Sequence, residues 1–571
     1  MSHDNNVDVD TPLTPTFIVI MLPTDYAAVG GIVTVAILIY SFLRLLYNAF
    51  LHPLSGFPGP LIYRTSRLPY LYHMARGDLT FTLLPLHEKY GPVIRIAPDE
   101  LSFTHPDAWK DIYGHRVGNN HNVLELPKAR RFYRTRGTLP NIISEEDRAH
   151  HGLVRRVLSH GFSDQNLRAR ESVITGYADT LIRQLRRFSV SSADEEAAAP
   201  ARRIPMNLTA WYNWVTVDII SHLTFGEPSG CLDRAERDPW IEAMNGTVLD
   251  FIPLQILAYL GFDGLINRLL RAFMNTNRNH RTCTRNSTTL KKIHSCGDSA
   301  GSELTISMDD IDRKLTKNPV VTMADPDLVE KILQKKDAWN LSDDEILGNA
   351  AALLIAGSET TATLLAGLTY LLCKHPQVME KLKQEVRSRF ASDSEITLTS
   401  VLELKYLLAC LDEALRLYPP VPIGPLRTVP EGSGGVTIAG HVVPGGTDVA
   451  VWHWPMFHYS KHWERPMEYR PERFLQEDSA GPRYAGDMNY TNNTGLYSAD
   501  RLDLLQPFNV GPRNCLGRNL AYSEMRLVLA RMILNFDMEL VEPETDWIGK
   551  QRADFLWRKG PLPVYLSPVN L

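Results

Sequence analysis

A cysteine in a glycine-flanked loop near the C-terminus is the residue best placed to do chemistry in this chain. Cys515 stands between Gly511 and Gly517, and Arg513 precedes it by two positions. Glycine adopts backbone conformations closed to other residues, so this loop can approach a flat ligand closely. Backbone N–H groups and the N-terminus of a helix predicted at 518–533 would stabilise a thiolate, and Arg513 would neutralise a nearby carboxylate. The alternative is a buried, unreactive cysteine.

An acid beside an alcohol, Glu359 and Thr360, forms a second reactive group. The pair lies in a long apolar stretch, 346–373, which begins after the capping-box sequence Ser342–Glu345 and is predicted to be a core helix. In a dry pocket such a pair can pass protons through water. Gly357, in the middle of this helix, indicates either the close approach of a ligand or a local opening. The alternative is a polar kink whose threonines bond to the backbone.

Three charged residues are spaced to support these elements rather than to react. Glu413 and Arg416 lie three positions apart on a helix predicted at 402–417, which allows a salt bridge. Arg473 follows in the segment Tyr469–Phe474 and could join them in a buried network. The alternative is two unrelated charge pairs on the surface.

The order and spacing of these motifs resemble the cytochrome P-450 family. The segment Phe508–Gly517 matches the pattern Phe-x-x-Gly-x-Arg-x-Cys-x-Gly of that family's haem-binding loop. The resemblance implies that Cys515 is the axial ligand of the iron of haem b, that Arg513 pairs with a haem propionate and that Phe508 shields the sulfur.

The helix motif and the charged residues resemble the same family. The segment Ala356–Thr361 matches its acid–alcohol pattern, and this places Ala356 and Gly357 among the cofactor-binding residues. The resemblance implies that Thr360 passes a proton to dioxygen and that Glu359 links it to bulk water. The family's structural network would here consist of Glu413, Arg416 and Arg473.

Further cofactor and substrate contacts follow from the resemblance. His151 and Arg155 lie four positions apart on one helix face, where the family usually has Trp-x-x-x-Arg bound to a propionate. An imidazole N–H can still donate, so His151 is expected to replace the tryptophan; the alternative is a solvated helix face. Arg427 is the other implied propionate partner. The substrate pocket is expected to include Val421, Ile423 and Ser358.

The N-terminal region predicts a membrane anchor. Residues 26–43 carry no charge, and a bilayer span needs about 20 apolar residues. Aspartates but no basic residues precede the stretch and arginines follow it, which places the tail in the lumen and the body in the cytosol. We expect a lumenal tail at 1–25, a transmembrane anchor at 26–47, a proline-rich hinge at 48–62 and a catalytic domain at 63–571. The alternative is a cleaved signal peptide.

Length, composition and resemblance together predict the fold class. The 571 residues are 44% hydrophobic, enough for a large core, and the resemblance implies a mainly α fold with a small β subdomain. Strands are expected at 93–97, 101–104, 436–439 and 447–452. The apolar stretch 247–270 is either a core helix or a lid over the access channel that dips into the membrane. Residues 281–320 match least well and are either a surface insertion or an imperfect gene model.

The function that the resemblance implies is a haem-thiolate monooxygenase that inserts one oxygen atom from O2 into a C–H bond of an apolar small molecule. Electrons would come from NADPH through a membrane reductase, and the location would be the endoplasmic reticulum membrane, crossed once. Similarity to fungal secondary-metabolite hydroxylases of the trichothecene type indicates a terpenoid, polyketide or alkaloid substrate. The net charge of −5 argues against nucleic-acid binding, and the scattered cysteines fit a reducing compartment.

Two other functions are compatible with a haem-binding loop. One is a haem-thiolate isomerase or dehydratase that does not use O2, and the other is a non-catalytic membrane haem sensor. Neither needs a complete acid–alcohol pair, so Glu359 and Thr360 favour the monooxygenase.

Overall fold

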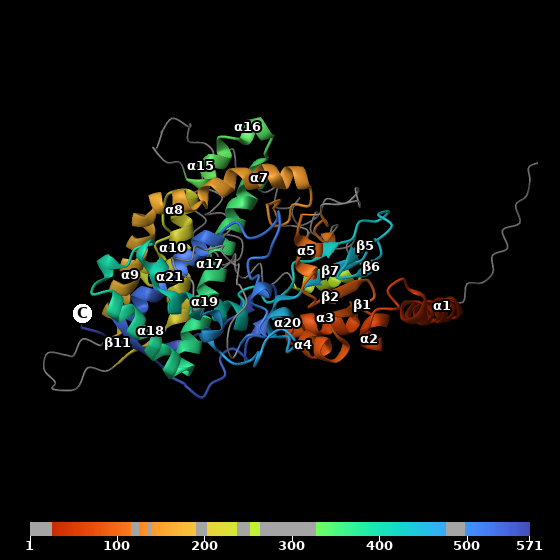
Figure 1. Cartoon of the computed structure of the whole chain (residues 1–571). Coiled ribbons are helices and arrows are strands. Elements are labelled where there is room, and N and C mark those ends of the chain that lie inside the picture. Colours follow the sequence, from red (N-terminus) through yellow and green to blue (C-terminus); the bar gives the residue numbers. More distant parts are fainter. Residues whose placement is uncertain are drawn as a thin grey trace, which may run out of the picture.

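A helical body and a smaller strand-rich part lie side by side, and the N-terminal helix extends away from the strand-rich part (Figure 1). The computed structural model describes residues 26–115, 125–133, 139–189, 203–236, 252–262, 327–475 and 497–570. This arrangement confirms the prediction of a mainly α fold with a small β subdomain.

The N-terminal helix α1 (Tyr26–Leu46) is apolar, and its side chains from Ala28 onward are exposed. Together with the π-helical turn η1 (Tyr47–Leu51), it gives a stretch, Ala28–Leu51, that is long and apolar enough to cross a membrane. Helix α17 (Asp343–Lys374) is also long and apolar enough to cross a membrane, but 67% of its most apolar stretch is buried. We therefore take α1 as the candidate span and α17 as a core helix, as its polar residues indicated.

The strand-rich part is organised on a four-stranded sheet with the order β1–β2–β7–β4. The hairpin of β1 (Val93–Ala97) and β2 (Glu100–Phe103) is joined by β7 (Asp448–Val451), which pairs parallel to β2 from far along the chain. The edge strand β4 (Arg427–Thr428) pairs with β7 and thereby fixes the position of Arg427. Near the sheet lie α2 (Leu61–Thr65), α3 (Leu68–Arg76), α4 (Leu79–Tyr90), α5 (Ala108–Tyr113), α20 (His453–His458) and the hairpin β5 (Val436–Ile438)–β6 (His441–Val443).

The helical body surrounds α17, which contacts α10, α18, α19 and α21. Its longer helices are α7 (Arg148–Gly161), α9 (Glu171–Ser189), α10 (Leu208–Phe225), α18 (Pro376–Arg389), α19 (Lys405–Leu417) and α21 (Arg518–Asn535). Its shorter helices are α6 (Arg130–Tyr133), α8 (Asp164–Ala169), α11 (Cys231–Arg234), α15 (Leu328–Leu333), α16 (Lys336–Trp339), η2 (Asp393–Glu395), η3 (Ser400–Glu403), η4 (Pro471–Phe474) and η5 (Leu502–Leu504). Its strands are β3 (Pro205–Asn207), β8 (Phe536–Leu540), β9 (Arg552–Ala553), β10 (Trp557–Arg558) and β11 (Pro563–Pro568).

The boundaries of α17 follow from its terminal residues. Ser342 and Glu345 form the predicted capping box, in which each side chain accepts a hydrogen bond from the other's backbone N–H. The helix runs without a break to Lys374, where His375 and the following proline end it. The helix is therefore continuous through Gly357, and the hydroxyls of Thr360 and Thr363 bond to backbone carbonyls, as the alternative interpretation of this motif expected.

Two predictions lie partly or wholly outside the described residues. The segment 281–320 is not described, and of 247–270 only 252–262 is, with helix at 252–259. Tyr259 in this short piece lies against Tyr70 of α3, with the ring centroids 6.1 Å apart. Ile252 and Gln255 line the main cavity, while Ile256 and Tyr259 pack against the buried residues of the strand-rich part, so this piece of the chain contacts both the cavity and the core.

Candidate active site

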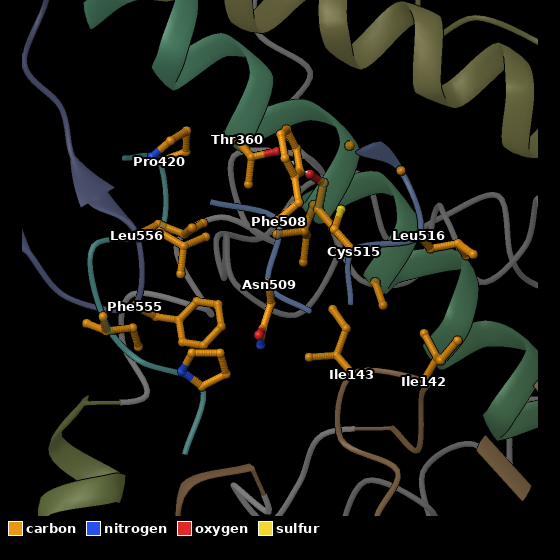
Figure 2. A pocket seen from close by; sticks show the side chains of 18 of the residues that line it. Ile142, Ile143, Thr360, Pro420, Phe508, Asn509, Cys515, Leu516, Phe555 and Leu556 are labelled. Atoms are coloured by element: carbon orange, nitrogen blue, oxygen red, sulfur yellow. Dashed lines mark hydrogen bonds between the residues drawn. The ribbon is translucent and has the colours of Figure 1, made fainter. Parts of the chain in front are cut away.

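A cavity of about 760 Å³ lies between α17, the loop before α21, and the strand-rich part. Cys515, from the loop, and Thr360, from α17, both line it, as Figure 2 shows. These two residues are 155 positions apart in the sequence, so the fold brings together the two reactive groups that the sequence singled out.

The loop that carries Cys515 is held by its own backbone. The backbone N–H of Cys515 donates to the carbonyl of Phe508 at 2.8 Å. Gly511 has φ +78°, and a Cβ there would lie 1.9 Å from the carbonyl oxygen of Tyr113, so only glycine fits. Gly517 is different, because its φ is −87° and a Cβ would meet open space. The freedom of glycine is therefore used at Gly511 and not at Gly517.

The protein alone favours the thiol form of Cys515. Burial raises the pKa of this thiol, and the N–H groups of Gly517 and Arg518 and the charge of Arg155 only partly oppose that rise. The accessible surface of Cys515 faces the cavity, so the side chain is exposed there while being deep in the protein. The loop therefore supplies the predicted backbone N–H groups, which favour the thiolate, but burial outweighs their effect on the pKa. A metal cation bound to the sulfur would remove the proton.

Five cationic or imidazole side chains line one side of the cavity: Lys128, His151, Arg155, Arg427 and Arg513. Two of them already have partners in the loop region. Arg513 binds the carboxylate of Glu125 at 2.7 Å and the backbone carbonyls of 145 and 146, and Arg155 donates to the carbonyl of Asn514 at 2.7 Å. Both arginines therefore tie the cysteine loop to the segment before α7 and to α7 itself.

Arg427 is the least satisfied of these cations. Its side chain is only 3% exposed, and Nε and Nη1 have no hydrogen-bond partner among the described residues. Burial lowers the pKa of Arg427, and the neighbouring charge of Arg513 adds to that effect. Lys128 is hydrogen-bonded across the sheet edge to Arg427's strand and donates through Nζ to the carbonyl of Ile142 at 2.8 Å. Burial, followed by the charges of Arg513 and Arg427, lowers the pKa of Lys128 to about 6.

His151 lines the same side of the cavity and is buried. Burial, with Lys128 and Arg513 adding to it, lowers the pKa of His151 to about 3, so the imidazole is neutral at physiological pH. A neutral imidazole keeps one N–H donor. The position therefore suits the donor role expected from the sequence.

These residues fit a haem. The buried donors of Arg427 and the surplus of positive groups beside it call for anionic partners, and a haem presents two propionates. A thiol lies in the same cavity, and Phe508, whose ring centroid is 5.3 Å from that of Tyr522, stands beside the loop. The remaining lining is mostly apolar, including Leu364, Val421, Ile423, Phe555 and Leu556.

Only part of the α17 motif faces this cavity. Ala356, Gly357 and Thr360 line it, and the Thr360 hydroxyl donates to the carbonyl of Ala356 at 2.7 Å. Ser358 does not line it, which corrects its predicted place in the substrate pocket. Two residues before Thr360 on a helix, Ser358 points the opposite way and donates to the carbonyl of Leu354 at 2.7 Å.

Glu359 lies on the outer side of α17, away from the cavity. Its Oε1 accepts from Asn213 of α10 at 2.9 Å, and its Oε2 pairs with the ammonium group of Lys559. The structure therefore brings Thr360 to the cavity and holds its acidic neighbour outside it.

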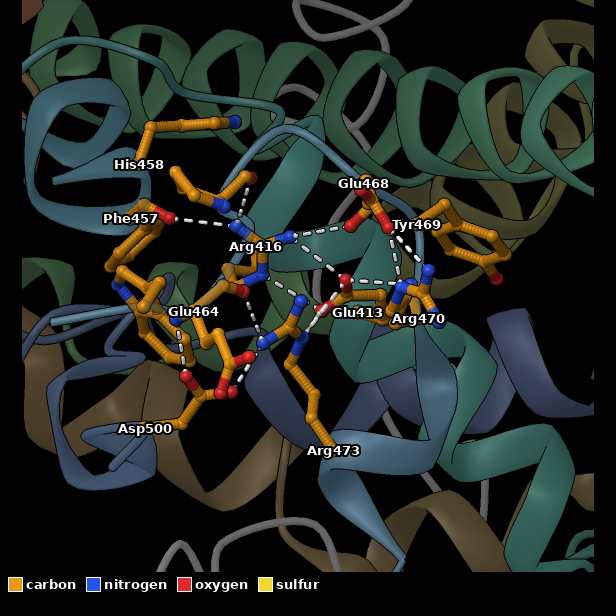
Figure 3. A network of polar contacts seen from close by, with 12 residues as sticks. Glu413, Arg416, Phe457, His458, Glu464, Glu468, Tyr469, Arg470, Arg473 and Asp500 are labelled. Atoms are coloured by element: carbon orange, nitrogen blue, oxygen red, sulfur yellow. Dashed lines mark hydrogen bonds and ion pairs between the residues drawn. The ribbon is translucent and has the colours of Figure 1, made fainter. Parts of the chain in front are cut away.

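The predicted charged network is present and fully buried (Figure 3). Glu413 binds Arg416 at 2.8 Å and Arg473 at 3.0 Å, with no exposure of any of the three side chains. Arg416 also donates to the carbonyls of Phe457, Pro466 and Glu468. A fourth member, Asp500, pairs with Arg473. The network joins α19 to the segments that lead to the cysteine loop.

Sequence reasoning missed four residues near the site: Lys128, Asp500, Glu524 and Lys559. Lys128 lies in a basic stretch, 128–131, whose sequence does not indicate a place at the site. Its place there follows from the pairing of Lys128 with Arg427 of β4, which only the structure shows. Glu524 on α21 lines the cavity and is 0% exposed, and its place on the inner helix face could have been read from its spacing with Leu520 and Leu527.

A family model and several curated proteins that match this chain all belong to one family. The family model for cytochrome P-450 matches residues 65–564. The cytochrome P-450 monooxygenase tpeC of Talaromyces stipitatus is 41% identical over 534 residues, 93% of each chain. The cytochrome P-450 monooxygenase prhB of Penicillium brasilianum is 39% identical over 94% of this chain and 98% of its own. Averantin hydroxylase of Dothistroma septosporum is 35% identical over 96% of this chain and 93% of its own.

Proposed function

The chain belongs to the cytochrome P-450 family and is a monooxygenase, and on that premise we propose which reaction it performs. It inserts one atom of O2 into a C–H bond of an apolar intermediate of fungal secondary metabolism, a terpenoid, polyketide or alkaloid. The observation that carries this proposal is that Cys515 and Thr360 line one largely apolar cavity of about 760 Å³. Relatives in fungi, one of them named averantin hydroxylase, support the substrate class.

The residues of this chain divide the work of holding the cofactor. A bound haem supplies the activation of dioxygen when its iron is held by a cysteine sulfur. Cys515 would bind the iron, and the unpartnered donors of Arg427 would take a propionate. The remaining donors for the propionates would come from Lys128, His151, Arg155 and Arg513. Burial of these groups strengthens each charge-assisted hydrogen bond.

Proton delivery would use the two sides of α17. Thr360 holds its hydroxyl at the cavity wall, bonded to the carbonyl of Ala356, where it can hand on a proton and receive another. Glu359 stands one residue away on the side of α17 that faces away from the cavity, bonded to Asn213 and Lys559. The acid would resupply Thr360 from bulk water, which requires its side chain to leave these partners.

The apolar wall would orient the substrate and exclude water. Val421 and Ile423 line the cavity from the segment before β4, and Phe555 and Leu556 line it from the turn between β9 and β10. Contacts of this kind favour an apolar ligand and keep the proton route dry.

We propose that the electrons come from NADPH through a membrane reductase and that α1 anchors the chain once in the endoplasmic reticulum membrane. In support, α1 is exposed and apolar, and large apolar side chains on α2, which contacts α1, on α3 and on the piece 252–262 are also exposed. These are Leu61, Ile62, Leu68 and Tyr72 on α2 and α3, with Leu257, Leu260 and Phe262 on the neighbouring piece. Protease protection of tags at the two ends, in intact microsomes, tests the single pass: only an N-terminal tag should be protected.

The deciding experiment is expression with a fungal reductase, followed by metabolite profiling against a deletion strain. The expected result is a product that carries one added oxygen, labelled by 18O2 and dependent on NADPH. Product formation without O2 would instead support an isomerase or dehydratase. In the same assay, Thr360→Ala should divert NADPH consumption from product to hydrogen peroxide, while Thr369→Ala, a buried threonine elsewhere on α17, should not.

A further inference from the structure

Lys559 makes an unusual pair of contacts for a lysine near the end of a chain. Its Nζ pairs with Glu359 Oε2 and also donates to Thr363 Oγ1 at 2.8 Å. The Lys559 side chain is 6% exposed and that of Glu359 is 16% exposed, so the pair is largely shielded from solvent. Shielding strengthens the pair relative to one at the surface.

Glu359 is held from two directions. Asn213 of α10 donates to its Oε1 at 2.9 Å, while Lys559 occupies its Oε2. Both oxygens therefore have a donor on the side of α17 that faces away from the cavity. Thr360, the next residue, faces the cavity. The acid can approach Thr360 only if at least the contact with Lys559 is given up.

The segment that carries Lys559 also forms a wall of the cavity. β9 and β10 pair as a hairpin, with Trp557 opposite Ala553, and the turn between them places Phe555 and Leu556 at the cavity. Lys559 follows β10 directly. The tip of this short hairpin thus lines the cavity, and the residue that follows its second strand pairs with Glu359.

We propose that Lys559 is a positioning residue that couples occupancy of the cavity to the release of Glu359. An apolar ligand that displaces Phe555 and Leu556 shifts the hairpin, weakens the pair between Lys559 and Glu359, and frees the carboxylate to serve Thr360. The proposal rests on the proposed function of Glu359 as the acid of the relay. A partly shielded ion pair shifts an equilibrium by roughly threefold, so proton delivery should be slower by about this factor when the cavity holds no substrate.

The first test changes the lysine in the full-length, haem-loaded protein with its reductase. Lys559→Met should raise NADPH consumption in the absence of substrate about threefold, because the hold on Glu359 is lost. Lys559→Arg, which keeps the charge, and Lys550→Met, which removes an exposed lysine of the same region, should stay near wild type. Consumption by Lys559→Met equal to that of Lys550→Met would overturn the proposal.

The second test needs no turnover, and its main comparison uses the wild-type protein. Hydrogen exchange of the wild-type protein is followed with and without 4-phenylimidazole as a probe that occupies the cavity. Exchange in 552–559 and in 356–363 should change together, and in Lys559→Met the response of 356–363 should disappear. A response confined to 552–559 in the wild type, or no response in either segment, would overturn the coupling.

A Glu359→Gln variant separates this inference from the proposed function. If Glu359→Gln forms product from NADPH as efficiently as wild type, Glu359 is not the acid and the proposed relay fails. If Glu359→Gln is impaired while Lys559→Met behaves like Lys550→Met, the relay stands and only the role of Lys559 fails. If both are altered and Lys559→Arg restores the wild-type pH profile of NADPH consumption, both stand.

Discussion

Gly357 of α17 packs against Ile220 of α10. A Cβ added to Gly357 would lie 2.7 Å from Cγ1 of Ile220, and an added methyl group would have to push this side chain away. The glycine in the middle of α17 is therefore explained by helix packing. The sequence suggested the approach of a ligand or a local opening; the helix is unbroken at this point, and Gly357 also lines the cavity.

Gly357→Ala should therefore destabilise the protein, although alanine is the better helix former. Overpacking in a tight contact costs about 1–3 kcal/mol, more than the roughly 1 kcal/mol that alanine gains in a helix. Urea unfolding measures the change. Gly176→Ala on α9, where a Cβ would meet open space, is the matched control and should be neutral or stabilising. Adding Ile220→Val to Gly357→Ala should recover part of the loss; equal stability of the two glycine variants would contradict the packing argument.

The sequence predicted the elements of the site whose signal is local. Cys515 with its flanking glycines, the capping box of α17 and the spacing of Glu413 and Arg416 are all read within a few neighbouring residues. The same local pattern gave the strand of β1 with its bounds.

Contacts between distant segments could not be predicted, because the sequence of one segment does not indicate which other segment it will contact. Lys559 meets Glu359 across 200 positions, and Asp500 meets Arg473 across 27 positions. The orientation of Ser358 was wrong for a simpler reason: the motif was treated as a unit, whereas successive helical residues point about 100° apart.

Asp500→Ala should destabilise the protein much more than the loss of a surface ion pair. Asp500 pairs with Arg473, whose side chain is 0% exposed, and accepts from the backbone N–H of Glu464 at 2.6 Å. Removal of one partner from a buried pair costs about 3–5 kcal/mol, because the other charge stays buried. Thermal unfolding measures it, with Asp503→Ala as the control. Asp503 pairs with Arg501 at the surface, where a pair is worth about 1 kcal/mol or less.

The control also defines failure for this prediction. If the Asp500 and Asp503 variants lose similar stability, the pair of Asp500 with Arg473 contributes no more to the free energy of unfolding than a surface ion pair does. A second expected consequence is weaker haem retention in Asp500→Ala, because the network supports the segments that lead to the Cys515 loop.

Arg427→Met should weaken the hold on haem. The side chain is buried, and two of its nitrogens have no hydrogen-bond partner among the described residues. A charge-assisted hydrogen bond to a buried propionate contributes about 1.5–3 kcal/mol, so its loss should speed transfer of haem to apomyoglobin roughly tenfold or more. Arg130→Met, which removes an arginine that is 65% exposed in the same region, should leave the transfer rate unchanged. Equal rates for the two variants would mean that Arg427 does not bind the cofactor.

Glu524 should make the protein less stable as the pH rises. Its side chain is 0% exposed, and neither carboxylate oxygen has a hydrogen-bond partner of good geometry among the described residues. Burial raises the pKa of this carboxyl well above its usual value. The hydroxyl of Thr361 lies near this carboxyl and lowers its pKa slightly, against the larger effect of burial. In the unfolded chain the group ionises near its ordinary pKa of about 4.3, whereas the folded protein keeps the proton to a higher pH.

The sign of the effect follows from which state holds the proton. Below about pH 4 both states are protonated and Glu524 adds no pH dependence. Above that pH the unfolded state loses the proton first, so the free energy of unfolding falls by about 1.4 kcal/mol per pH unit until the folded-state pKa is reached. Glu524→Gln cannot ionise and should therefore equal the wild type near pH 4 and exceed it in stability at pH 7 and above. Denaturant unfolding across this pH range measures the difference, with the exposed Glu544→Gln as control. A constant difference between Glu524→Gln and wild type at every pH would show that the buried carboxyl does not retain its proton.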